Sequence, residues 1–176
     1  MSPLIHGAVG WLIAQPLQRR RDRMVVTAVA VLPDVDGLGL LVSEDLYLAW
    51  HHRLAHGFGA AVVVTVACGL LLRPRGLGAL LACLAFHSHI AMDLCGSGPG
   101  WPILYGWPWW DGEWLPAWQW DLASWQNSLV GLGTIVGCLS MALRTRRTPV
   151  ELFSLRADAR VVSALRLRFA REKKQP

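Results

Sequence analysis

Five apolar segments dominate the first 143 residues and restrict what the chain can fold into. They cover residues 4–18, 24–32, 59–72, 77–94 and 128–143. Alanine, valine and leucine predominate in them, and no alternation of apolar and polar residues persists, so we expect helices and no sheet. A helix that is apolar all round is buried in protein or in lipid. The sequence therefore predicts an all-α, membrane-associated bundle of about five apolar helices, with a Trp-rich loop and a basic C-terminal helix.

Composition favours a membrane protein over a soluble or disordered one. Only 16% of the residues are charged, against roughly 25% in ordinary soluble domains. No run of about 18 residues is free of both charges and helix breakers, so we expect no spanning helix of full length. The segment 24–32 should end at Pro33, because the residue before a proline avoids the helical conformation.

The connections between the segments are of two kinds. Short arginine-rich stretches follow the first, third and fifth segments, at 19–23, 73–75 and 144–147. Long stretches follow the second and fourth, and nearly all the acidic residues gather with every histidine at that end. Alternate connections lie at opposite ends of an up-and-down bundle. The positive-inside rule then predicts an inner-membrane protein with a cytoplasmic basic end. The alternative is a soluble bundle whose arginines stabilise helix C-termini.

The last residues form a separate basic tail. We predict a metal-binding helical membrane domain over 1–143 and a basic amphipathic tail over 144–176, which holds ten Lys/Arg and three acidic residues. Thr148, Pro149 and Glu151 are typical of a capped helix start. That helix would lie on the anionic cytoplasmic surface or remain solvated. The basic charge belongs to the tail, so nucleic acid is not an expected partner, whereas a cytoplasmic protein is.

The histidines and aspartates have spacings that suit metal binding. His89 and Asp93 are four residues apart and share one face of a helix, whereas His87 points elsewhere. His52 and His56 have the same spacing. Imidazole and carboxylate are ligands of zinc, manganese and iron. We expect one to three zinc ions, with manganese or iron as alternatives, and the candidate ligands are His6, Asp34, Asp36, His51, His52, His56, His89 and Asp93.

Asp34 and Asp36 follow Pro33 and are two residues apart. If the chain is extended there, their side chains point to opposite sides. One could then bind a metal ion while the other bridges to a second ion or orients a histidine. We predict Asp36 as a bridging ligand or general base.

These motifs resemble a family of bacterial membrane-bound, metal-dependent hydrolases, which includes LexA-binding, inner-membrane-associated proteins. The resemblance covers residues 5–127 and rests on Ile5-His6, Leu32-Pro33-Asp34-Val35-Asp36, His51-His52-Arg53-Leu54-Ala55-His56, His89-Ile90-Ala91-Met92-Asp93 and the Trp-Pro pairs at 101 and 107. It implies that the matching histidines and aspartates bind metal. Many members have one more residue between the two histidines of the His-Arg motif, so either His51 or His52 is the ligand. A more distant similarity, to zinc-dependent phospholipases C and single-strand nucleases, implies phosphoester hydrolysis.

We therefore expect a membrane-associated metal-dependent hydrolase of phosphoesters, with its site on the outer face. Arg53 would steady an anionic substrate, which would be a small phosphoester or a phospholipid, and membrane lipid would surround the bundle. The alternative is a non-catalytic membrane protein with a structural metal site and a partner-binding basic tail. Eight of the ten tryptophans lie in 101–125. They would form an aromatic belt at the membrane interface or a substrate platform over the metal.

Overall fold

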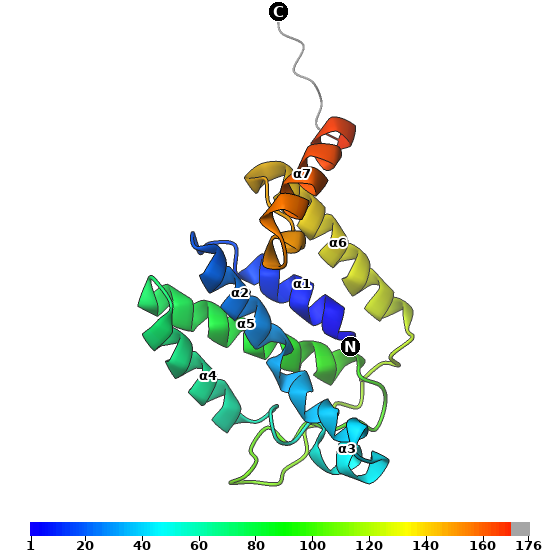
Figure 1. Cartoon of the computed structure of the whole chain (residues 1–176). Coiled ribbons are helices and arrows are strands. Elements are labelled where there is room, and N and C mark those ends of the chain that lie inside the picture. The colour runs from blue at the N-terminus through cyan, green and yellow to red at the C-terminus, as the bar shows by residue number, and fades with distance from the viewer. Residues whose placement is uncertain (170–176) are drawn as a thin grey trace, which may run out of the picture.

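The computed structural model describes residues 1–169, which form seven α-helices and two 3₁₀ segments (Figure 1). The elements are α1 (Pro3–Ile13), α2 (Arg20–Val31), η1 (Leu32–Leu41), α3 (Glu44–Trp50), α4 (Phe58–Leu71), α5 (Arg75–Gly96), α6 (Trp125–Thr145), η2 (Pro149–Leu152) and α7 (Leu155–Phe169). Among these residues, β-type pairing is confined to one isolated antiparallel bridge between Ile103 and Trp114. The all-α prediction is confirmed.

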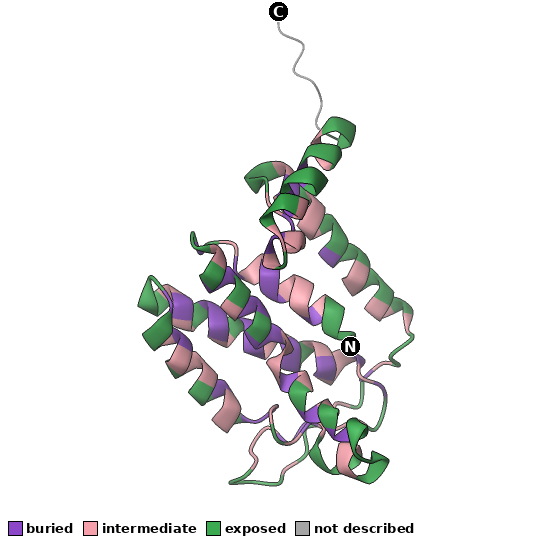
Figure 2. Cartoon of the chain, viewed as in Figure 1, coloured by how far each residue is buried: buried purple, intermediate pink, exposed green. Residues whose placement is uncertain are grey.

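The helix α5 lies at the centre of the bundle and packs against α1, α2 and α4. Its buried face includes Ala82, Ala85 and Phe86, and Figure 2 shows the buried residues concentrated where these helices meet. The helices α1 and α2 approach closely at Gly10, where an added Cβ would lie only 2.3 Å from the Cβ of Ala30.

Three helices are long and apolar enough to cross a membrane, contrary to the expectation from the sequence. They are the helical stretch Arg20–Leu41, which joins α2 and η1, then α5 and α6, of 22, 22 and 21 residues. Charged residues at their ends and glycines within them do not interrupt these helices. Of the polar residues inside α5, His89 and Asp93 are buried against protein and His87 and Ser88 are partly buried, so polar groups inside the span are largely turned toward protein.

Pro33 ends α2 as predicted, but the chain after it is not extended. It continues as the 3₁₀ segment η1, with Pro33 in the first turn, where its missing N–H costs nothing. Asp34 and Asp36 therefore lie on a helical segment. The expectation that they point to opposite sides of an extended strand was wrong in its backbone geometry.

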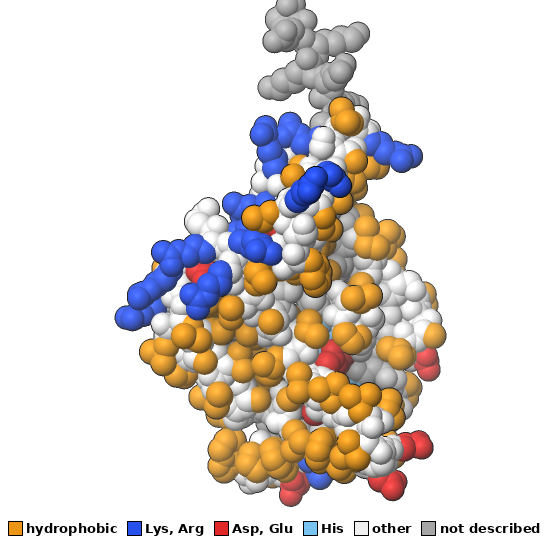
Figure 3. Space-filling view, viewed as in Figure 1, with side chains coloured by type: hydrophobic (Ala, Val, Ile, Leu, Met, Phe, Trp, Pro, Cys, Tyr) orange, Lys and Arg blue, Asp and Glu red, His pale blue; other side chains and the backbone are white. Residues whose placement is uncertain are grey.

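The two ends of the bundle differ in charge. In Figure 3 most Lys and Arg side chains gather at one end, around α7 and the starts of α2 and α5, and most acidic side chains appear at the other end. Hydrophobic side chains cover much of the surface between them. The helix α6 lies at one side of the bundle, where it contacts α1 and α7 (Figure 1), and only 11% of its apolar window is buried.

The first part of the basic tail is docked onto the N-terminal helices. Thr148 caps η2 as predicted, but Glu151 does not complete a capping box. Its carboxylate instead pairs with Arg23, with Nη2 and Oε2 2.5 Å apart, and accepts a hydrogen bond from Trp11 Nε1 at 3.0 Å. Residues 170–176 of the predicted tail lie outside the described part of the chain.

Candidate metal centre

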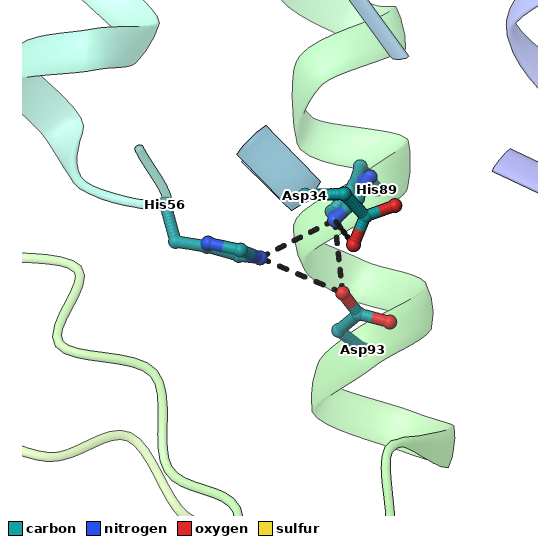
Figure 4. A group of neighbouring side chains, drawn as sticks. All are labelled: Asp34, His56, His89 and Asp93. Carbon is teal, nitrogen blue, oxygen red and sulfur yellow. Dashed lines mark hydrogen bonds and ion pairs between the residues drawn. The ribbon is translucent and has the colours of Figure 1, made fainter. Parts of the chain in front are cut away.

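Four buried or half-buried side chains converge at the acidic end of the bundle. Asp34 comes from η1, His56 from the loop before α4, and His89 and Asp93 from one face of α5 (Figure 4). One ligand atom of each residue lies within 4.8 Å of all the others. Segments far apart in the sequence thus bring two imidazoles and two carboxylates to one point.

The spacing of these atoms suits a small divalent ion. His89 Nε2 lies 2.9 Å from Asp93 Oδ2, 3.3 Å from His56 Nε2 and 3.7 Å from Asp34 Oδ1. Ligand atoms about 2.0–2.1 Å from a tetrahedral zinc ion are about 3.3 Å apart. In addition, Asp34 Oδ2 is buried and makes no hydrogen bond with any described residue. The donor set and its spacing therefore fit zinc.

Hydrogen bonds at Nδ1, the ring nitrogen that points away from the group, orient both of its histidines. His89 Nδ1 lies 2.8 Å from the carbonyl oxygen of Ala30, which is in the last turn of α2. Carbonyls in the last turn of a helix have no partner within it, so this oxygen is free to accept. His56 Nδ1 lies 2.8 Å from Asp36 Oδ2. In each ring Nδ1 is occupied by this hydrogen bond, and Nε2 points toward the other ligand atoms of the group. This is the usual arrangement of metal-binding histidines.

Asp36 is buried beside the four-residue group and is not one of its members. Its Oδ1 lies 2.8 Å from His51 Nδ1, and its Oδ2 lies 2.8 Å from His56 Nδ1 and 3.4 Å from the backbone nitrogen of Ala55. A carboxylate can only accept, so the two Nδ1–H groups donate to it. The sequence predicts that one of Asp34 and Asp36 binds a metal ion while the other bridges to a second ion or orients a histidine. The geometry of Asp36 supports the last of these roles.

The adjacent histidines His51 and His52 occupy different positions. His52 is buried, its Nε2 lies 3.9 Å from Asp93 Oδ2, and its Nδ1 lies 3.2 Å from the carbonyl oxygen of Pro102. His51 is partly exposed and contacts Asp36. His52 adopts a left-handed backbone conformation, with φ at 63°, and its ring is tilted by 38° from that of His51. His52 is thus the nearer of the two to the group.

The charge states of the loop histidines differ. Burial, together with the nearby His56 and His51, lowers the pKa of His52 to about 3, so its ring is neutral at pH 7, as a metal ligand must be. Burial alone would lower the pKa of His56, but hydrogen bonds with Asp36 and Asp93 outweigh it and raise that pKa to about 8. Metal binding at His56 Nε2 therefore displaces a proton.

His6 approaches the group from the opposite side of Asp93. Its ring stacks on that of His89 with centroids 3.8 Å apart, and its Nε2 lies 3.2 Å from Asp93 Oδ1. The side chain is fully buried, and neither ring nitrogen makes a well-aligned hydrogen bond with a described residue. The Met1 amino group lies 2.5 Å from the same Oδ1. The two oxygens of Asp93 thus face different nitrogen atoms, with Oδ1 toward His6 and Met1 and Oδ2 toward His89.

Two cavities lie beside the loop histidines. One, of about 200 Å³, is lined by Tyr47, His51, His52, Ser97 and Trp101, with Met1 and Leu122 at its edge. The other, of about 310 Å³, lies against His51 and Trp101 as well and is lined by Arg53 and Glu113. Trp101 contacts the rings of Tyr47, His51 and His52 edge-on, with centroids 5.8–5.9 Å apart.

Sequence reasoning missed several residues that build this site. The carbonyls of Ala30 and Pro102 orient His89 and His52, and a backbone atom leaves no signal in the residue pattern. Tyr47 stacks on His51 with centroids 4.7 Å apart, and its position four residues earlier in the chain was the one available hint. Of the Trp-rich loop, Trp101 packs on the histidines, whereas Trp109, Trp110 and Trp118 are exposed.

Taken together, the apolar helices and the buried His/Asp group define an all-helical membrane protein with a candidate metal-binding centre. The sequence model of the YdjM inner membrane protein family matches residues 1–163, and the chain belongs to this family. The prediction of a bacterial inner-membrane protein is thereby confirmed. Neither the curated proteins nor the solved structures contain a match to the chain.

Proposed function

We propose that this protein is a metal-dependent hydrolase of phosphoesters whose site faces the outside of the inner membrane. The observation that carries the proposal is the convergence of Asp34, His56 and His89 with Asp93, while hydrogen bonds from behind fix both imidazoles. Structural zinc sites are closed by four protein ligands, most often including cysteine, whereas catalytic sites leave a position for water. The mixed His/Asp donors and the adjoining cavities favour the catalytic kind.

Zinc is the metal that we propose, with manganese or iron as alternatives. The four residues of the group, His52 and His6 would share two ions, with three ligands for each, so that each ion keeps a position for water. A bound zinc ion supplies Lewis acidity, which polarises the phosphoryl group and makes a water molecule acidic near pH 7.

His51 is the side chain best placed to move a proton. Asp36 holds its Nδ1 at 2.8 Å, and the ring lines both cavities. Its Nε2 can therefore accept a proton from a water molecule in the cleft. The water oxygen then bonds to phosphorus, the bond from phosphorus to the leaving oxygen breaks, and that oxygen takes a proton from solvent.

Arg53 supports an anionic substrate. Arg53 and His51 both line the larger cavity. A negatively charged phosphoryl group in that cavity would therefore lie between the guanidinium of Arg53 and the imidazole of His51, the proposed base. Guanidinium groups bind phosphate oxygens through paired, charge-assisted hydrogen bonds. The placement of the site outside rests on the arginines at the opposite end of the bundle.

The test combines metal analysis with an assay. Protein purified in detergent should contain zinc and hydrolyse a chromogenic phosphodiester, and a chelator should remove both properties until zinc is restored. Replacing His89 and Asp93 together with alanine should remove at least one ion, and His89→Ala alone should lower the rate by about 10²-fold or more.

His87→Ala is the matched control, because His87 lies on the same helix but bonds to Tyr105 and to the carbonyl of Cys83. It should keep its metal and its activity. Unchanged metal content in the double variant would contradict the site. Zinc-loaded wild-type protein that hydrolyses no phosphoester would favour a structural metal in a non-catalytic membrane protein.

A further inference from the structure

A groove between α1 and α6 leads from the membrane-spanning region toward the candidate metal centre. Its volume is about 470 Å³, and it is lined by Pro3 and Ile5 of α1 and by Asn127, Ser128 and Gly131 of α6. This volume lies within the range of ligand pockets, roughly 300–1,000 Å³. Most of the lining is apolar or small.

The groove borders the cleft at the histidines. Met1 and Leu122 line both the groove and the 200 Å³ cavity, whose other walls include His51 and His52. A molecule in the groove can therefore reach the proposed base with its other end. Leu122 itself is largely exposed.

The surroundings of the groove indicate what would occupy it. The helix α6 is apolar and long enough to span a membrane, and it is the least buried of the three candidate spans. Most of its surface therefore faces lipid chains. Gly131 leaves room where the two helices face each other, because an added Cβ would lie 3.7 Å from Ile5 Cδ1.

We propose that this groove holds the hydrocarbon chain of a membrane lipid whose phosphoester lies in the cleft beside His51 and His52. The inference rests on the proposed function and makes it more specific: the substrate is a phospholipid that enters laterally from the bilayer. Hydrolysis adds water across its phosphorus–oxygen bond and yields an alcohol and a phosphate monoester, or inorganic phosphate from a monoester. The hydrocarbon chain of the lipid binds in the groove, and its phosphoester is hydrolysed in the cleft.

Filling the groove should separate long-chain from short-chain substrates. Gly131→Leu and Ser128→Leu should lower hydrolysis of a long-chain phospholipid by about tenfold, because losing burial of two methylene groups corresponds to about that factor. Hydrolysis of a short-chain, water-soluble analogue with the same headgroup should change less than about twofold. Gly131→Ala, which makes only an ordinary contact with Ile5, should behave as wild type.

Gly133→Leu is the matched control. It lies two residues along the same helix, about 200° around it, and an added Cβ there meets nothing within 4 Å. This variant makes the same change in composition and helix propensity without entering the groove. Equal loss of long-chain activity in Gly131→Leu and Gly133→Leu would overturn the proposal.

A second measurement works without catalysis. Chelator-treated protein in vesicles would be irradiated with a phospholipid that carries a diazirine in its chain, and the labelled peptides would be mapped. We expect labelling of residues 1–5 and 127–131 that falls about tenfold in Gly131→Leu and Ser128→Leu but not in Gly133→Leu. Groove labelling without hydrolysis of any phosphoester would support the lipid site and contradict the hydrolase. Hydrolysis of the short-chain analogue without groove labelling would do the reverse.

Discussion

Asp36 accepts hydrogen bonds from two histidines and thereby sets which ring nitrogen each of them presents. His51 and His56 are both held through Nδ1. The Nε2 of His51 is therefore available in the cleft, and the Nε2 of His56 is available to the four-residue group. A buried carboxylate in this position acts through the residues that it orients, as in the carboxylate–histidine–zinc arrangement. This role differs in a measurable way from that of a general base.

Asp36→Asn distinguishes the two roles. An asparagine amide keeps one acceptor oxygen, and its NH₂ group cannot accept, so one histidine loses its partner. If Asp36 orients ligands, zinc affinity should fall about 10–100-fold, as measured by competition with a chelator. If it is the base, affinity should stay the same while the rate falls about 10²–10⁴-fold. Asp111→Asn, at an exposed carboxylate, is the control and should change neither quantity.

The sequence could indicate ligands but not all of their roles. His89 and Asp93 are four apart on a helix, and that spacing sufficed to place them together. His52 could not be separated from His51 by spacing, because the choice depends on the left-handed backbone at His52 and on a carbonyl 50 residues away in the chain. Which of Asp34 and Asp36 joins the four-residue group, and which one orients the histidines, depends in the same way on the 3₁₀ geometry after Pro33.

At the scale of elements, η2 is attached to α1 and α2 through one buried carboxylate. Glu151 pairs with Arg23, which also donates to the carbonyls of Leu17 and Gln18, and Arg20 donates to the carbonyl of Leu152. Burial alone would raise the pKa of Glu151, but the hydrogen bonds from Arg23 and Trp11 outweigh it and hold that pKa below 4.5. The ion pair therefore stabilises the folded protein near neutral pH.

Glu151→Gln should weaken this attachment in a pH-dependent way. Leaving the buried Arg23 without its partner should cost about 3–5 kcal/mol at pH 7. Because the folded-state pKa is lowered, the wild-type contribution is complete above pH 4.5 and is lost as pH falls through that lowered value. Thermal unfolding in detergent should show a large difference between the proteins at pH 7 that shrinks in acid. A constant difference, or an equal effect of Glu44→Gln at an exposed site, would contradict the role of the ion pair.

Helix lengths were underestimated from the sequence for an identifiable reason. Counting an uninterrupted apolar run treats His87, His89 and Asp93 as breaks in the span, although polar residues that face the protein interior do not prevent a helix from crossing a bilayer. The same count stops the second span at Pro33, where the chain in fact continues as η1. Positions of the apolar segments were predictable, because apolar burial defines them, but their ends depend on tertiary contacts.

The whole molecule is polarised along the bundle, with arginines at one end and the His/Asp group at the other. Three candidate membrane spans and two shorter apolar helices lie between Met1 and the tail. The positive-inside rule counts Lys and Arg in short loops, and the segments 19–23, 73–75 and 144–147 all lie at the same end. We therefore predict that the basic end is cytoplasmic and that the metal centre faces out.

Cysteine labelling in intact cells tests this orientation. In a variant without the four native cysteines, Asp111→Cys should react with an impermeant reagent and Gly76→Cys should not. Both positions suit the experiment, because Asp111 is exposed and an added Cβ at Gly76 meets nothing within 4 Å. Gly112 would be a poor choice, since its Cβ would lie 2.0 Å from Trp110. After cell lysis Gly76→Cys should react as well, which shows that it was protected by the membrane and not by the fold. The reverse pattern would place the metal centre in the cytoplasm, where its substrate would have to come from the inner leaflet.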